Sequence, residues 1–291
     1  MRNILPVLTV VLAIFAIWYA AAIGLNKAWA YDKAERAGIE LNASDLVADT
    51  WSQDKPRLPV PHQVAAELWK TTGAMVQRGR AFSKRSLLWH GWITLSSTLL
   101  GFVFGTGLGI LLAVGIVHSR AMDMSVMPWV IASQTVPILA IAPMIVVVLA
   151  SMQVDDLIAK GVISMYLSFF PVVVGMVKGL RSPSTMQMDQ MKTWNASRTQ
   201  TFWKLRLPSS TPYLFASLKV GIAASLIGAV VAELSLSQDG GLGARMLVGS
   251  YYGQTIQIWS ALIGAAILAA LLVMTIGVMQ RMTLTRMGMT A

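Results

Sequence analysis

Long apolar runs alternate with short polar segments along this chain, and the pattern predicts an all-α membrane protein with about six transmembrane helices. An α-helix needs about 20 apolar residues to cross a bilayer. The runs that approach or exceed this length are 4–25, 89–117, 124–150, 157–180, 213–236 and 256–279. Pro137 and Pro143 lie inside the third run and remove backbone donors, so we expect that helix to be bent or broken.

The segment between the first two runs, residues 26–86, is polar and carries charges of both signs. Its first half has little helical patterning and is predicted to be a solvated loop. Its second half opens with Leu58-Pro59-x-Pro61 and continues with apolar residues at helical spacing, which predicts a short amphipathic helix. The chain then divides into a first transmembrane helix (1–25), an outer loop (26–86), a core with five more helices (87–282) and a tail (283–291).

The first apolar run has two interpretations. Arg2 and the small-x-small sequence Ala28-Trp29-Ala30 would suit a cleaved signal peptide. The apolar run is longer than the roughly 7–15 residues of a signal core. A retained first helix is therefore favoured, and the residues that follow it lie outside in either case.

A few polar or helix-breaking positions inside the apolar runs are candidates for a translocation path: Gln134, Pro137, Ser225 and Glu233. A broken helix at membrane depth is tolerated where it is buried or lines a wet cavity, although Gln134 would equally serve an interhelical hydrogen bond. A carboxylate in an apolar helix is costly unless it is paired or hydrated. Glu233 lies about one turn from the end of its run, so it would equally reach the interface.

Composition supports a membrane protein, because 55% of the residues are hydrophobic and only 12% are charged. The formal charge of +10 would suggest nucleic acid in a soluble protein, but here it marks charges kept at membrane edges, and no nucleic-acid partner is expected. Three scattered histidines without a cysteine indicate no metal site.

The distribution of basic residues predicts the orientation of the helices. The short loops assigned to the outside hold only Lys160 and Arg245, and the long outer loop carries little weight because of its length. Both termini and the loop 182–211 are therefore predicted to be cytoplasmic. The basic residues assigned to the inside are Arg2, Arg120, Lys178, Arg181, Lys192, Arg198, Lys204, Arg206, Arg281 and Arg286.

The loop 182–211 contains a basic, aromatic segment, 189–208, between apolar helices. If it is helical, Trp194, Arg198, Thr201 and Phe202 fall on one face. Pro208 is expected to end that helix before the next apolar run. A short amphipathic helix at this place could be an anchor on the membrane surface or a handle for a soluble partner.

The spacing of this segment resembles the loop signature of ABC importer permeases, Glu-Ala-Ala, three residues, Gly, nine residues, Ile-x-Leu-Pro. Asp189-Gln190-Met191 takes the Glu-Ala-Ala positions and Asn195 the Gly position, while Leu205, Leu207 and Pro208 complete the match. Asn departs least from Gly, because it visits the left-handed region more readily than most residues and so permits a turn between two short helices. Leu58-Pro59-x-Pro61, the run from Gln134 to Pro143 and the loop Asp239-Gly240-Gly241-Leu242-Gly243 resemble the nitrate, sulfonate and taurine branch of these permeases.

The resemblance implies a type I ABC importer permease fold in a bacterial inner membrane, with the loop as a cytoplasmic coupling helix. It implies as partners a cytoplasmic ABC ATPase dimer that binds the ATP, a periplasmic solute-binding protein and a second permease subunit, expected to be identical, within the lipid bilayer. Relatives import sulfonates, taurine, nitrate or vitamin precursors of the pyrimidine type. The residues implied to face the ATPase are Asp189, Trp194, Asn195, Arg198, Phe202, Trp203, Leu205, Leu207 and Pro208.

The sequence carries no phosphate-binding loop of the Gly-x4-Gly-Lys-Ser/Thr type and no catalytic motif, so we expect a non-catalytic subunit without a cofactor of its own. One alternative is a secondary transporter or channel that uses Glu233 and Lys219 as its intramembrane charges. Another is a membrane anchor without transport activity. A pair of isolated charges without an inverted repeat argues against the secondary transporter.

Overall fold

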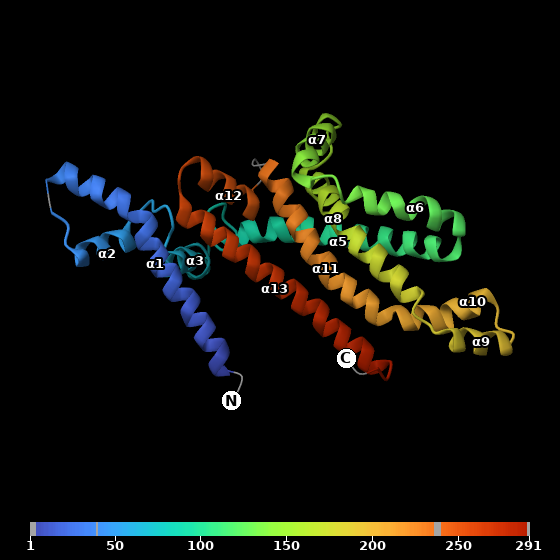
Figure 1. Cartoon of the computed structure of the whole chain (residues 1–291). Coiled ribbons are helices and arrows are strands. Elements are labelled where there is room, and N and C mark those ends of the chain that lie inside the picture. Colours follow the sequence, from blue (N-terminus) through green and yellow to red (C-terminus); the bar gives the residue numbers. More distant parts are fainter. Residues whose placement is uncertain (1–3, 39, 236–239, 290–291) are drawn as a thin grey trace. The chain divides into compact units, whose positions relative to one another are not determined.

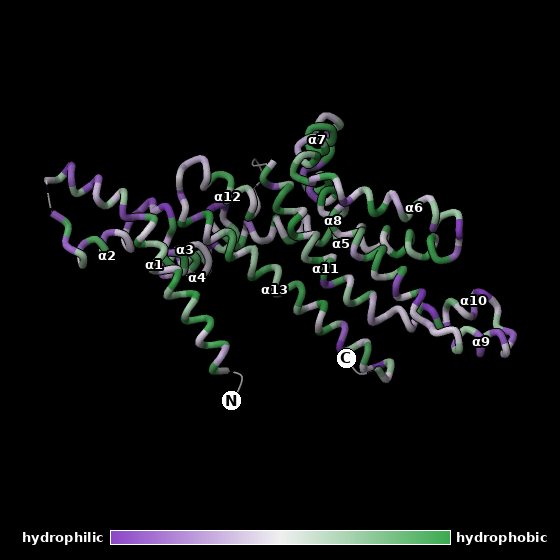
Figure 2. Tube along the Cα trace, in the orientation of Figure 1, coloured by the Kyte–Doolittle hydropathy of each residue, from purple (hydrophilic) through white to green (hydrophobic). Residues whose placement is uncertain are grey.

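The computed structural model describes residues 4–38, 40–235 and 240–289, and every regular element in these ranges is helical (Figure 1). Among the described residues, five helices are long and apolar enough to cross a membrane, and a bent pair, α6 (Arg120–Ser133) with α7 (Ile138–Ser151), would make a sixth span. Apolar residues dominate these helices along most of their length (Figure 2). The predicted all-α membrane fold is confirmed.

The chain forms two compact units, which are described separately. The first comprises residues 1–90 and 245–265, and the second comprises residues 91–244 and 266–291. Three helices contribute residues to both units: α5 (Leu87–His118), α12 (Leu242–Tyr251) and α13 (Thr255–Arg286).

In the first unit, α1 (Ile4–Ala37) is longer than the predicted span, and α2 (Ala43–Ser52) packs back against it. The solvated loop predicted after residue 25 is therefore wrong. Asn26 is 1% exposed, and its amide donates to the carbonyls of Thr50 (3.2 Å) and Leu58 (2.9 Å) while its oxygen accepts from the Leu58 N–H (3.1 Å). These long-range bonds fold the polar segment onto α1.

An ion pair supports the same hairpin. Lys33 of α1 lies 2.6 Å from Asp49 of α2, and its hydrogen bond holds the pKa of that carboxyl below its ordinary value. The Trp18 ring of α1 packs on Trp259, with centroids 4.9 Å apart, and its N–H donates to the Pro59 carbonyl at 2.9 Å.

The predicted amphipathic helix is present as α3 (Pro61–Thr71), with Val64 buried and Trp69 exposed, and α4 (Gly73–Gln77) follows it. Proline at the first helical position suits α3, because an N–H there would have no partner in the helix. Glu67 of α3 and Arg245 of α12 lie 3.7 Å apart, which connects the amphipathic helix to the later part of this unit.

The second unit is organised on α8 (Asp156–Leu180) and α11 (Leu207–Ser235), which make the most extensive contact between any two described helices. A Cβ on Gly228 would lie 2.7 Å from the Ser164 Cα, so the two backbones touch. From α5, Gly101 and Gly105 pack in the same way on Ser164 and Ser168. These glycines of α5 serve packing, since small residues let membrane helices approach closely.

The bend predicted in the third apolar run is confirmed. The axes of α6 and α7 differ by 97° across residues 134–137. Pro137 has no N–H to offer and stands at the cap position of α7, while the Tyr166 hydroxyl of α8 donates to the Ser133 carbonyl that the break frees. Pro143, by contrast, lies inside α7.

The backbone contact of Gly228 generates a stability prediction. Gly228→Ala should destabilise the protein by about 1–3 kcal/mol, because the added methyl meets backbone atoms of α8 that cannot rotate away. Gly107→Ala in α5 is the matched control, since a Cβ there meets nothing within 4 Å. Thermal unfolding in detergent measures both, and equal melting temperatures for the two variants would contradict the packing.

Candidate functional site

The segment with the loop signature folds into two short helices. Ser184 caps α9 (Thr185–Thr193) and Ser197 caps α10 (Arg198–Thr201), each in a reciprocal capping box with a glutamine, Gln187 and Gln200. Between them Asn195 has a φ of 50°, in the left-handed region. The turn inferred at this asparagine is present. Trp194 consequently caps the end of α9 and Arg198 begins α10, so their predicted place on one face of a single helix is wrong.

The expected break at Pro208 is also wrong. A π-helical turn, η1 (Phe202–Arg206), follows α10, and α11 begins at Leu207, so that Arg198–Ser235 forms one long helical span. The Leu207 N–H donates to the carbonyl of Phe202, five residues earlier. Pro208 has no N–H to donate to an α-helical hydrogen bond. The wider π-helical turn lies just before it, and the helix continues through this position.

The aromatic side chains of the segment point in two directions. Phe202 is half-buried, and its ring contacts the His118 ring at the end of α5 with centroids 5.1 Å apart. Trp194 and Trp203 are 67% and 61% exposed. Phe202 thus fastens the segment to the helix bundle, whereas the two tryptophans remain free to meet another surface.

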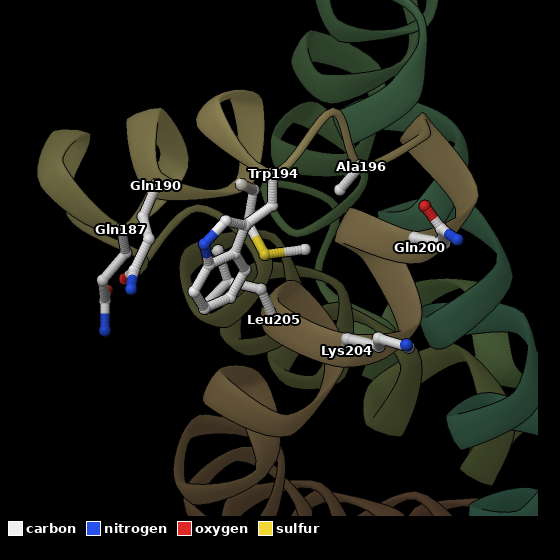
Figure 3. A pocket seen from close by; sticks show the side chains of 8 residues that line it. Gln187, Gln190, Trp194, Ala196, Gln200, Lys204 and Leu205 are labelled. Atoms are coloured by element: carbon white, nitrogen blue, oxygen red, sulfur yellow. The ribbon is translucent and has the colours of Figure 1, made fainter.

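A pocket of about 410 Å³ lies between the two short helices (Figure 3). Trp194 and Leu205 give it an apolar wall, and Lys204 stands at its rim. Glutamines supply most of its polar lining. The residues that line it are Gln187, Gln190, Met191, Trp194, Ala196, Gln200, Lys204 and Leu205.

The charges of the segment are exposed. Asp189, at the first position of the loop signature, pairs with Lys192 at 2.7 Å, and both side chains are mostly exposed. Arg198 lies on the exposed surface of α10. Leu207 and Pro208 are half-buried in the first turn of α11, where Leu207 packs against the core of the second unit.

The candidate path residues do not come together in one place. Gln134 and Pro137 lie at the bend between α6 and α7, and the Gln134 amide donates to the Ser133 hydroxyl at 3.3 Å. Ser225 is fully buried and donates to the Thr98 carbonyl of α5 at 2.8 Å.

Glu233 is fully buried near the end of α11 and holds the chain that leads into α12. One carboxylate oxygen, Oε2, accepts from the Thr94 hydroxyl (3.0 Å) and the Gly243 N–H (2.8 Å). The other, Oε1, has no hydrogen-bond partner among the described residues. The Thr94 hydroxyl also accepts from the Leu242 N–H at 2.9 Å. A buried carboxylate thus binds the Gly-Leu-Gly segment to α5.

Position 241, which packs directly against the Glu233 carboxylate, requires glycine. Gly241 has a φ of 121°, and a Cβ there would lie 2.2 Å from the Glu233 Cδ. Lys160 of α8 is 2% exposed and acts electrostatically on the carboxylate, although no direct ion pair joins them in the part of the chain that the structure describes. The assignment of Lys160 to an outer loop is therefore wrong. Asp239, from the same sequence signature, and Arg2 lie outside the described residues.

Sequence reasoning missed Thr94 and the partnership of Lys160 with Glu233. Thr94 is separated from Glu233 by 139 residues and belongs to a run of hydroxyl residues that suits any packed membrane helix. The only local signal for Lys160 was its position just inside an apolar run, where an ammonium is costly unless it is compensated.

Comparison with known proteins identifies the family. Residues 105–288 match the family described as the binding-protein-dependent transport system inner membrane component. A probable ABC transporter permease protein of Haemophilus influenzae is 31% identical over 64% of this chain and 74% of its own length.

Two further relatives have more specific names. A formylaminopyrimidine transport permease protein of Halalkalibacterium halodurans is 30% identical over 58% of this chain and 66% of its own. A riboflavin transport system permease protein of Chloroflexus aurantiacus is 27% identical over 77% of this chain and 78% of its own. The chain therefore belongs to this family of ABC transporter permeases, and its resemblance to the nitrate, sulfonate and taurine branch is confirmed.

The left-handed turn generates the first prediction for the site. Asn195→Gly should leave the loop intact, because glycine adopts a positive φ freely, whereas Asn195→Val should cost about 1–3 kcal/mol locally. Limited proteolysis of the segment 182–211 should accelerate only in the valine variant. Thr199→Val, an exposed change of nearly equal size in α10, is the control. Equal cleavage of all variants would show that the turn is not strained.

The buried carboxylate of Glu233 generates the second prediction for the site. Glu233→Gln should destabilise the protein by about 2–4 kcal/mol, because it removes a buried negative charge that attracts the buried Lys160 side chain. Adding Lys160→Met should recover part of that loss. Thermal unfolding of the two single variants and the double variant measures the interaction as a cycle. Strictly additive effects would mean that the two charges do not interact.

Proposed function

We propose that this chain is the transmembrane subunit of an ATP-driven importer and that the segment 182–211 is its contact with a cytoplasmic ATPase. The observation that carries the proposal is the pair of short capped helices with a pocket between them, together with the exposed side chains of Trp194, which lines the pocket, and Trp203, in the turn that follows. Exposed aromatic residues around a pocket are typical of protein-binding surfaces. The lack of a phosphate-binding loop in this sequence supports the proposal that a separate partner hydrolyses the ATP.

The helix that follows the loop is suited to transmit motion. Arg198–Ser235 is a helical span of 38 residues, so a displacement at Arg198 reaches Glu233 through about 53 Å of hydrogen-bonded backbone. Because α8 and α11 touch through their backbones, α8 must follow α11. A pull on the loop would therefore tilt both helices together and change which side of the membrane the bundle opens to.

The remaining partners follow from the family. A second copy of this chain would complete the path, an external binding protein would deliver the solute, and two ATPases would drive the cycle. The charge distribution favours cytoplasmic termini and a cytoplasmic loop. Gln134, Pro137, Ser225 and Glu233 are retained as candidates for the path.

The proposed substrate is a small organic solute. Relatives are named for formylaminopyrimidine, riboflavin, aliphatic sulfonates and nitrate. The buried carboxylate of Glu233 would repel a small inorganic anion at the same depth in the membrane. The proposal therefore favours a substrate of the pyrimidine or vitamin-precursor type.

The alternative of a secondary transporter has little support. Glu233 and Lys219 are 14 residues apart on α11, which corresponds to about 21 Å along the helix axis. Over that distance they form no proton or ion relay by themselves. The hydrogen bonds of Glu233 to Thr94 and Gly243 instead suit a role in closing the segment that leads from α11 into α12.

A cross-linking experiment tests the proposal. A photoreactive residue replacing Arg198 in the full chain, activated in the native membrane, should capture a soluble protein with a Gly-x4-Gly-Lys-Ser/Thr loop. A photoreactive residue at Gln153, which is exposed beyond the end of α7, is the control and should not capture it. Mass spectrometry identifies the products. Lipid adducts alone at position 198 would contradict the coupling role and make the segment a surface anchor.

A further inference from the structure

A second pocket, of about 500 Å³, lies between α11 and α13 in the second unit. It shares no lining residue with the pocket of the loop. Val273, Met274 and Val278 give it an apolar wall, and Lys219 and Arg281 give it two positive charges. None of its lining residues is acidic. We call it the Lys219 groove.

Lys219 is held in place without a counter-charge. It is half-buried on a membrane-spanning helix, and a Cβ on Gly277 would lie 3.7 Å from its Cε and 3.9 Å from its Nζ. Glycine at position 277 thus gives the lysine room to lie against α13. Among the residues that the structure describes, the Lys219 ammonium makes no ion pair and no hydrogen bond.

The groove lies where the apolar part of α13 ends. Residues 256–279 form its apolar run, and Gln280 and Arg281 are the first polar residues after it. Gly277, which lies opposite the end of the Lys219 side chain, is within about one helical turn of that boundary. Lys219 therefore stands at the depth at which a long cationic side chain reaches the lipid headgroups.

We propose that the Lys219 groove binds the headgroup of an anionic phospholipid. The phosphate would lie between Lys219 and Arg281, and an acyl chain would cover the exposed side chains of Met274 and Val278, which are 65% and 56% exposed. Basic pockets between membrane helices on the cytoplasmic side suit such headgroups. The assignment of the groove to the cytoplasmic side of the membrane rests on the orientation proposed above. The binding of the lipid itself does not depend on transport.

Other occupants fit the groove less well. A small soluble anion would satisfy the charges but would leave the apolar wall uncovered. A second copy of this chain would need a carboxylate to place there. At the loop end of the second unit, the described acidic residues Asp123 and Asp189 are already paired, with Arg181 and Lys192.

Lipid binding to the purified full chain tests the proposal. Native mass spectrometry with phosphatidylglycerol and phosphatidylcholine should show preferential binding of phosphatidylglycerol. Lys219→Gln should weaken that binding about fivefold, because a basic residue near an anionic headgroup contributes about that factor. Arg286→Gln removes a charge from the same helix outside the groove and should leave the binding unchanged. Equal binding of both lipids, or equal effects of both variants, would overturn the proposal.

A second variant separates a built site from diffuse attraction. Gly277→Leu keeps both charges but fills the groove, so it should also release the lipid, whereas Gly277→Ala should retain it because an alanine Cβ makes only ordinary contact. Melting temperatures check that both variants fold. Retained binding in a folded Gly277→Leu variant would contradict the groove.

The remaining occupants are tested directly. An excess of inorganic phosphate or ethanesulfonate should not displace the lipid, and displacement would assign the groove to a small anion. The chain has no cysteine, so Met274→Cys is a single-cysteine variant. A disulfide between two copies at this position in the membrane would assign the groove to the interface of a dimer. Neither outcome bears on whether Arg198 contacts an ATPase, so the two proposals fail separately.

Discussion

The backbone contact between α8 and α11 is the constraint on which the second unit depends. Gly228 rests on Ser164, and Gly175 and Gly179 of α8 rest on Ser217 and Ser210 of α11 in the same manner. In lipid the burial of apolar surface contributes little to helix association, so close packing of small residues must hold the pair. Neither helix can rotate without a clash of backbone atoms. Since the segment 182–211 joins the end of α8 to the start of α11, any force on it acts on both helices together.

Close packing also determines what polar groups can do in this bundle. Several buried polar side chains are matched to a particular neighbour: Ser225 to the Thr98 carbonyl, Ser168 to the Gly101 carbonyl and Glu233 to Thr94 and Gly243. The hydroxyls replace apolar contacts at little cost, because their bonds are made to carbonyls of a touching helix. Glu233 differs, since burial of a carboxylate is costly and only one of its two oxygens, Oε2, accepts hydrogen bonds among the described residues.

The sequence predicted the features that the bilayer imposes and missed those that arise from distant contacts. The span positions follow from the length of the apolar runs, and the bend near Pro137 follows from the chemistry of proline. The turn at Asn195 followed from one residue type at one signature position. The hairpin of α1 and α2 did not, because Asn26 is polar in sequence and becomes buried only through Thr50 and Leu58. The prediction for Lys160 was wrong for the same reason. Hydropathy cannot distinguish a lysine that reaches water from one that is buried near a carboxylate on another helix.

Pro208 shows why a correct local rule gave a wrong result. Proline removes a donor and ends most helices, so a break was expected at Pro208, between the segment 189–208 and the next apolar run. A flexible loop there would absorb motion before it reached the bundle. The π-helical turn at Phe202–Arg206 avoids this, since the Leu207 N–H bonds to the Phe202 carbonyl and the helix continues past the proline. Such a turn is weaker than an α-helical one. Phe202, packed on His118 and the core of the second unit, holds it in place, so α10 is joined to α11 by a helical turn that is fixed to the bundle at that ring.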